Sequence, residues 1–142
     1  MPTFTVAGAN LERVGPVVEV RITVNQAVEA ALRGAGAAIP TPLLVPAMID
    51  TGASCTVIRE GLAHQLGLQP TGTRVIHTAS HSNVHCYEFL VRLLFPNDIL
   101  FETNAVETPL KGQHIDCLIG RDVLAQGLLV YIGPDNLFSL SF

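Results

Sequence analysis

The sequence predicts a single, mostly β domain. Three observations support this prediction: a length of 142 residues, short apolar runs that alternate with polar residues, and 12 glycines and 9 prolines between those runs. Alternation with a period of two is typical of strands with one buried face. Glycine and proline in this number favour turns over long helices. We therefore expect one domain over residues 1–142, with many short strands and one or two short helices.

Composition narrows the range of partners. The chain is 49% hydrophobic and 14% charged, which suggests a strand-built core and apolar surface kept for a partner. A net charge of -4 without a basic cluster argues against nucleic acid. No apolar stretch reaches the ~20 residues that span a bilayer, and residues 1–4 do not begin a secretory signal. We expect a cytoplasmic protein with no membrane partner.

Residues 1–42 form the first section of the chain. Strands are expected at residues 3–7 and 18–24, where Val18, Val20, Ile22 and Val24 share one face. Residues 25–32 fit either a short helix or a loose loop, and the prolines at 40, 42 and 46 hold the chain extended. We expect residues 25–42 to be an inserted, mobile connection.

Residues 43–142 contain most of the predicted strands. We expect strands at 43–49 and 56–58, a helix over 59–66 ended by Gly67, and a hairpin over 73–95 with a polar tip at 78–83. Further strands are expected at 99–106 and 115–119, then a short helix from Arg121, then a hairpin of 128–132 with 137–142.

The stretch from Ala47 to Ser54 presents one carboxylate after an apolar strand, in the triplet Asp50-Thr51-Gly52. Alone, this triplet fits an aspartate that caps a turn at the end of a strand, with glycine for backbone freedom. A three-residue motif is weak evidence. Farther along the chain, a second apolar pair precedes a glycine in Leu118-Ile119-Gly120, and Arg121-Asp122 follows it.

These two motifs, in this order and with a polar-tipped hairpin between them, resemble the retropepsin-like aspartic proteases. That family is single-domain and retroviral in type, and this chain looks like a bacterial member. The resemblance covers residues 43–142: the motifs at 49–54 and 115–124, and the hairpin in the place of the flap. It implies a closed antiparallel β barrel that acts as a homodimer. It also implies an aspartic endopeptidase that cleaves peptide or protein substrates without a cofactor.

The chemistry of such enzymes requires a second acid. Two carboxylates about 3 Å apart share one proton and hold a water between them, and they titrate as a pair. The sequence has one Asp-Thr-Gly, and its other acids lack that setting, among them Asp98, Asp116, Asp122 and Asp135. A second copy of the chain must then supply the other Asp50 across a two-fold axis. The high apolar content fits an obligate dimer interface.

The resemblance also assigns roles to residues. Asp50 is expected to be the catalytic acid and base, Thr51 to bond across the dimer axis, and Gly52 to let the substrate backbone approach. Substrate contacts are expected from the cleft and the flap tip: Ala53, Ser54, Thr78, Ala79, Ser80, His81, Ser82 and Ile119. Structural support is expected from Leu118, Gly120, Arg121 and Asp122. Residues 138–142 resemble the family's dimerisation strand, and a partner chain would cover that edge.

Two departures from the family pattern affect these expectations. No glycine lies between Gly72 and Gly112, so the flap tip is expected to be stiffer than in glycine-rich flaps. Ser54 stands where retroviral members often carry an acid that pairs with the arginine at the position of Arg121. Arg121 is then left with three alternatives: backbone near Ser54, Asp122, or Glu60.

Other chemistries remain as alternatives. A protein of the same fold that binds an extended peptide by strand addition, with little or no proteolysis, is the main one. His77, His81 and His85 suggest a metal site, but three polar flap residues are the simpler interpretation, and we expect no metal. Three cysteines without CxxC spacing suggest reduced thiols. Ser54 and Cys55 are discounted as nucleophiles, because no histidine is placed by sequence to activate them.

Overall fold

The computed structural model describes residues 1–8, 10–77 and 82–142. The strands are β1 (Thr3–Ala7), β2 (Val17–Val24), β3 (Leu43–Ile49), β4 (Val57–Arg59), β5 (Gly72–Ile76), β6 (Val84–Phe95), β7 (Ile99–Thr108), β8 (Cys117–Ile119), β9 (Leu128–Ile132) and β10 (Leu137–Ser141). The helices are α1 (Leu11–Val14), α2 (Gln26–Gly34), α3 (Leu62–Gln65) and α4 (Arg121–Leu124), with 3-10 turns at Pro96–Asp98 and Gly133–Asp135. None of the helices in the described ranges is long and apolar enough to cross a membrane.

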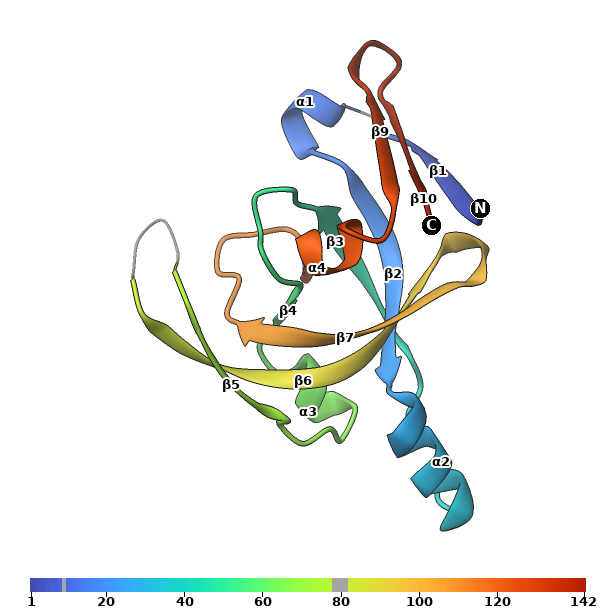
Figure 1. The fold of residues 1–142 in the computed structure, drawn as a ribbon, viewed down its shortest axis with the longest axis vertical. Helices are drawn as coiled ribbons and strands as arrows, with labels where there is room; N and C mark the ends of the chain where they lie inside the picture. The colour runs from blue at the N-terminus through green and yellow to red at the C-terminus, as the bar shows by residue number, and fades with distance from the viewer. Residues whose placement is uncertain (9, 78–81) are drawn as a thin grey trace.

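Six strands close into a barrel (Figure 1). The order is β2-β3-β8-β4-β7-β6, and an antiparallel pairing of β2 with β6 closes the ring, while β5 extends it beyond β6. The expected mostly β barrel is confirmed. Two pairings differ from the expected antiparallel pattern, because β3 runs parallel to β8 and β4 runs parallel to β7. As a result, Asp50 and Gly120 follow neighbouring strands that end at the same edge of the sheet.

The barrel core is built by strands whose alternation is visible in the sequence. Val18, Val20, Ile22 and Val24 of β2 are all buried, as expected from their period of two. Strand β6 continues the pattern with Phe89, Val91, Leu93 and Phe95. Full burial of such a side chain contributes about 1.5–3 kcal/mol relative to leaving it exposed. The interior is therefore stabilised mainly by these two long, adjacent strands.

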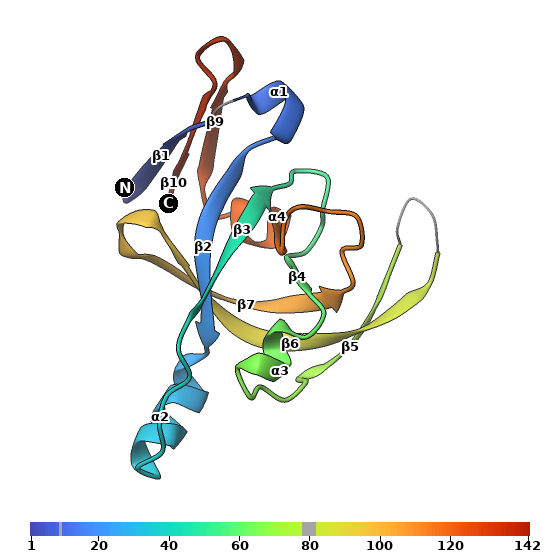
Figure 2. The same ribbon diagram turned by 180° about the vertical axis from the view of Figure 1, so that it is seen from behind.

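A separate three-stranded sheet, in the order β1-β10-β9, joins the two ends of the chain. Figures 1 and 2 show this sheet beside the barrel, with both termini on it. Strand β10 lies in the middle and pairs with β1 on one side and β9 on the other. Its Phe138 and Leu140 are fully buried.

The expectation that residues 138–142 form an open dimerisation strand is therefore wrong. Both edges of β10 are already paired within the chain, and the backbone N–H of Phe142 donates to the carbonyl oxygen of Pro2 at 2.9 Å. The Phe142 ring also packs on Phe101, with ring centroids 4.4 Å apart. Hydrophobic burial inside the chain, rather than pairing with a partner, covers this strand.

The expected helix over 59–66 is shorter than predicted, because Arg59 belongs to strand β4 and α3 begins at Leu62. The guanidinium of Arg59 forms an ion pair with Asp116 and donates to several backbone carbonyls, including that of Pro109 at 2.8 Å. These bonds hold Arg59 in extended backbone next to the loop that follows β7. The helix therefore begins beyond these bonds, at Leu62.

Helix α2 covers Gln26–Gly34, with Asn25 as its N-cap, so the helical alternative was correct (Figures 1 and 2). None of its residues is buried, and it extends away from the barrel. The buried Asn25 fixes its first turn. The Asn25 Oδ1 accepts from the backbone N–H of Val28 at 3.0 Å, and the Asn25 Nδ2 donates to the carbonyl of Leu90 at 2.9 Å. A single side chain thus caps the helix and ties it to β6.

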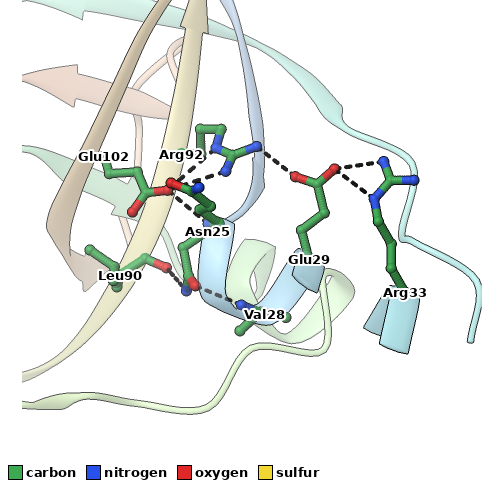
Figure 3. Close-up of polar contacts among 8 residues, drawn as sticks. Asn25, Val28, Glu29, Arg33, Leu90, Arg92 and Glu102 are labelled. Carbon is green, nitrogen blue, oxygen red and sulfur yellow. Dashed lines mark hydrogen bonds and ion pairs between the residues drawn. The ribbon is translucent and has the colours of Figure 1, made fainter. Parts of the chain in front are cut away.

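Charged side chains complete the attachment of α2, as Figure 3 shows. Glu29 accepts from Arg33 one turn later and from Arg92 on β6, each at 2.7 Å. The backbone N–H of Gln26 donates to Glu102 on β7 at 2.7 Å. The hydrogen bonds from Arg33 and Arg92 lower the pKa of Glu29 from its usual range. This network adds to the hydrophobic contact that α2 makes with the core through the partly buried Val28.

Replacing Asn25 should weaken the attachment of α2, because the side-chain hydrogen bonds of Asn25 to Val28 and Leu90 are both lost. We expect Asn25→Ala to lower the free energy of unfolding by about 1–2 kcal/mol, because an N-cap acceptor is lost at a buried position. Urea unfolding followed by circular dichroism measures this change. Asn10→Ala is the matched control, since Asn10 is itself exposed and caps the four-residue helix α1; it should cost about 0.5 kcal/mol. Equal losses in the two variants would contradict this account of α2.

Candidate active site

The carboxylate of Asp50 is held by the turn that follows β3. The backbone N–H of Asp50 donates to the carbonyl of Ile119 at 2.9 Å, which extends the pairing of β3 with β8 by one bond. The backbone N–H of Gly52 donates to Asp50 Oδ1 at 2.9 Å. Within the described ranges the other carboxylate oxygen has no hydrogen-bond partner. Asp50 therefore caps its own turn and keeps one oxygen available.

The two sequence motifs meet where Gly120 lies against the backbone of Cys55. A Cβ atom on Gly120 would lie 2.4 Å from the carbonyl carbon and oxygen of Cys55, far inside van der Waals contact. The backbone N–H of Arg121 donates to the carbonyl of Ala53 at 2.9 Å. Only glycine permits this approach at residue 120, and the approach presses the second motif against the Asp50 loop.

A buried polar cluster lies beneath this contact. Thr56 is fully buried, and its hydroxyl donates to Asp122 Oδ1 at 2.9 Å while it accepts from the backbone N–H of Gly120 at 3.2 Å. Thr103 of β7 donates to the other oxygen of Asp122, also at 2.9 Å. Asp122 therefore connects the loop after Asp50, strand β7 and helix α4. The sequence predicted Asp122 as support but did not identify its two threonine partners.

Arg121 follows the backbone alternative. Its Nη1 donates to the carbonyl oxygen of Thr51 at 2.8 Å, and the carboxylate of Asp122 is occupied by the two threonines. A guanidinium bond to a backbone carbonyl of the Asp50 loop needs no acidic partner at position 54. This explains how the loop is braced although Ser54 replaces the family's acid.

A cleft of about 710 Å³ opens beside Asp50. One side is the Asp50 loop, and the other includes the end of β5 that leads into the hairpin tip. Asp50 is the only carboxylate among the described residues that line it. The lining residues are Asp50, Gly52, Ala53, Ser54, Cys55, Val57, Arg74, Val75, Ile76, His77, Thr108, Leu110, Gln113 and Leu118.

Only some of the residues predicted to contact the substrate line the cleft. Ala53 and Ser54 line the cleft, whereas Ser82 is exposed and does not. Thr78, Ala79, Ser80 and His81 lie outside the described residues. Ile119, expected among the substrate contacts, is fully buried, and its neighbour Leu118, expected as support, faces the cleft. The exchange follows from the alternation of side chains along β8.

The remaining cleft walls were not predicted. They come from β5 and from the loop after β7, where Arg74, Leu110 and Gln113 are brought together by the barrel. His77 and His85 are not opposite each other in this hairpin, because the register pairs His85 with Val75. No local sequence pattern identifies Arg74, Leu110 and Gln113, because they share only their position around the cleft.

Other catalytic arrangements find little support in this geometry. His77 lines the same cleft as Ser54 and Cys55, which the sequence did not suggest, but it bonds to neither within the described ranges. Burial raises the pKa of the Cys117 thiol, and burial together with Cys55 raises that of Cys86. Over the described residues, no three His, Cys, Asp or Glu side chains gather to hold a metal ion; His81 lies outside them.

Comparisons with known proteins agree with the geometry. A family model described as aspartyl protease matches residues 28–123. A retropepsin-like aspartic protease from Rickettsia conorii shares the fold, with a TM-score of 0.59 and 17% identity, over 99% of this chain and 91% of that chain. The retroviral protease-like domain of Ddi1 from Leishmania major gives a TM-score of 0.42 and 18% identity, over 81% and 80% of the two chains. A sequence search of curated proteins found no match.

The polar cluster of Thr56, Thr103 and Asp122 should contribute to the stability of the protein. Asp122→Ala should lower the free energy of unfolding by about 1–3 kcal/mol, because the buried hydroxyl of Thr56 loses its acceptor. Thr103→Val is the matched control; its loss should be about 0.5–1.5 kcal/mol, since Thr103 is only half-buried. Urea unfolding measures both changes.

A double-mutant cycle identifies the cause. Once Thr56→Val has removed the hydroxyl, Asp122→Ala should cost less, with a coupling of about 0.5–3 kcal/mol between the two positions. Additive losses would show that Asp122 stabilises the protein by some other contact.

Proposed function

Because the chain belongs to the aspartyl protease family whose model matches more than half of it, we propose that it is an aspartic endopeptidase. Two chains form a homodimer, and the Asp50 carboxylate of each chain holds the water that attacks the peptide bond. The observation that carries this proposal is the single carboxylate at the cleft, in a loop braced by Gly120 and Arg121.

The other aspartates of the chain are poor candidates for the second carboxylate. Asp116 is paired with Arg59, and Asp122 accepts from two threonines beneath the site. Asp98 and Asp135 lie in exposed turns at the ends of hairpins. Since the chemistry needs two carboxylates about 3 Å apart, a second chain is the source that remains.

The proposed reaction divides the work between the two carboxylates. One takes a proton from the water as its oxygen attacks the peptide carbonyl carbon, and the other, already protonated, donates to the carbonyl oxygen. Proton transfer to the amide nitrogen then lets the carbon–nitrogen bond break. Thr51 is proposed to bond across the two-fold axis, while the Arg121 bond to its carbonyl holds its backbone in place.

The alternative function is peptide binding with little or no cleavage. One observation favours it: β5 is the last strand of its sheet and lines the cleft, with Val75 exposed at its outer end. An extended peptide could add to such an edge through main-chain hydrogen bonds. The same edge would also hold a substrate, so the test must measure cleavage and not binding alone.

Substitution of Asp50 separates the two functions. We expect Asp50→Asn to reduce peptide cleavage by about 10²–10⁴-fold or more, since acid–base catalysis is lost while the shape is kept. Cleavage of a peptide library, read by mass spectrometry with and without pepstatin, measures the change, and sedimentation should show an unchanged dimer. Asp98→Asn is the matched control and should keep full activity. Undiminished cleavage by Asp50→Asn would rule out the mechanism.

The shared proton also predicts the pH profile. We expect kcat/KM to reach its maximum at acidic to mildly acidic pH and to fall on both sides, because only the singly protonated pair has both an acid and a base. Initial rates on one cleaved peptide, measured from about pH 3 to pH 8, give the profile. A rate that still rises above neutral pH would be inconsistent with a carboxylate pair.

A further inference from the structure

The outer face of the β1-β10-β9 sheet changes character at its last strand. On β1 and β10 this face carries hydroxyl residues, with Thr3 bonded to Ser141 at 2.8 Å and Thr5 to Ser139 at 2.7 Å. The register continues these two rows onto β9 with Leu128 and Val130. Two strands therefore follow the rule of one polar face on an antiparallel sheet, and β9 breaks it.

Strand β9 also concentrates exposed apolar surface. Leu128, Val130, Tyr131 and Ile132 are 56%, 42%, 48% and 36% exposed, and they make up four of the ten large exposed hydrophobic residues of the described chain. All five residues of β9 are apolar or aromatic. A continuous apolar run is typical of a strand that is covered on both faces. Since β9 pairs only with β10 within the described ranges, its other edge is free for a partner strand.

The surface of β9 continues to the active-site loop. Leu129 of β9 and Thr51 line one shallow hollow of about 320 Å³, together with Arg121, Leu124 and Ala125. Figure 1 shows α4 between the end of β3 and the start of β9. The Leu129 side chain lies on the opposite face of β9 from Leu128 and Val130, because side chains alternate along a strand. A strand that paired with the free edge of β9 would carry side chains on both faces, and those on the Leu129 face would approach Thr51, next to Asp50.

We propose that a second copy of this chain docks on β9, by antiparallel pairing of the two β9 edges about a two-fold axis. This inference rests on the proposed function, because the need for a second Asp50 calls for a second copy near Thr51. A self-complementary patch is what such a symmetric contact requires. The pairing joins two three-stranded sheets into one of six strands, and each chain keeps β1 and β10 to itself.

Charge complementation at Val130, the middle residue of β9, tests this surface. Two copies of Val130 lie close together in the proposed pairing. Val130→Lys alone and Val130→Glu alone should each weaken dimerisation by about a hundredfold, since like charges then face one another. A mixture of the two variants should restore the dimer to within about tenfold of wild-type affinity. Sedimentation velocity across a concentration series measures all three.

Leu100 supplies the matched control, because it is 50% exposed but lies beside α2 with Glu29 and Arg33. Leu100→Lys and Leu100→Glu should leave the dimer unchanged. A second measurement guards against misfolded lysine or glutamate variants: Val130→Cys should form a disulfide-linked dimer under mild oxidation, and Leu100→Cys should not.

The outcomes for this surface and for the activity are distinct. Dimers that survive both charged substitutions, or a mixture that fails to re-form them, overturn the docking surface, even if wild-type protein still cleaves peptides. Restored dimers in the mixture support the surface, and restored cleavage supports the proposed activity as well. Restored dimers without cleavage by them or by the wild type support the surface and contradict the activity.

Discussion

The active-site architecture depends on the contact between the backbones of Gly120 and Cys55. This contact is too close for any side chain at residue 120, and it is the point at which two distant motifs become one structure. The parallel pairing of β3 with β8 brings the strands together, so that Asp50 and Gly120 leave the barrel side by side. The bonds from Arg121 to Ala53 and Thr51 then become possible, and Asp122 is brought to the buried Thr56. The geometry of the Asp50 loop is thus set by backbone contacts, and side-chain hydrogen bonds stabilise it.

The sequence predicts those parts of the structure that have a local pattern. Alternation located β2 and β6, and the two motifs located the Asp50 loop and its support, because strand periodicity and the residues of a tight loop are written in neighbouring positions. Cleft walls such as Arg74, Leu110 and Gln113 were missed, since only the closed barrel brings them together. The exchange of Leu118 and Ile119 has a similar cause: a motif gives the location of a strand, but the sheet decides which side chain faces the cleft.

Residues 138–142 were expected to be the dimerisation strand, whereas their side chains support an enclosed position. Residues 137–141 alternate, with Phe138 and Leu140 inside and Ser139 and Ser141 outside, as in a strand with one buried face. Residues 128–132 are apolar throughout, as in a strand covered on both faces. Position at the end of the chain suggested dimerisation for the alternating strand, whereas composition favours the uniform one. In the structure β10 is enclosed, and β9 forms one edge of the sheet, with β1 at the other.

An edge strand beside the catalytic loop has a consequence for control of the proposed activity. In the proposed enzyme each chain contributes one carboxylate, so the active species would be the dimer, and its amount would fall with the square of protein concentration well below the dissociation constant. The same hollow contains Thr51 and Leu129, so docking on β9 and alignment of the two Asp50 loops are parts of one event. Under this proposal, a single chain has a folded barrel and a formed Asp50 loop but only half of the site. Association would complete the site, and dimer affinity would then set the protein concentration at which cleavage begins.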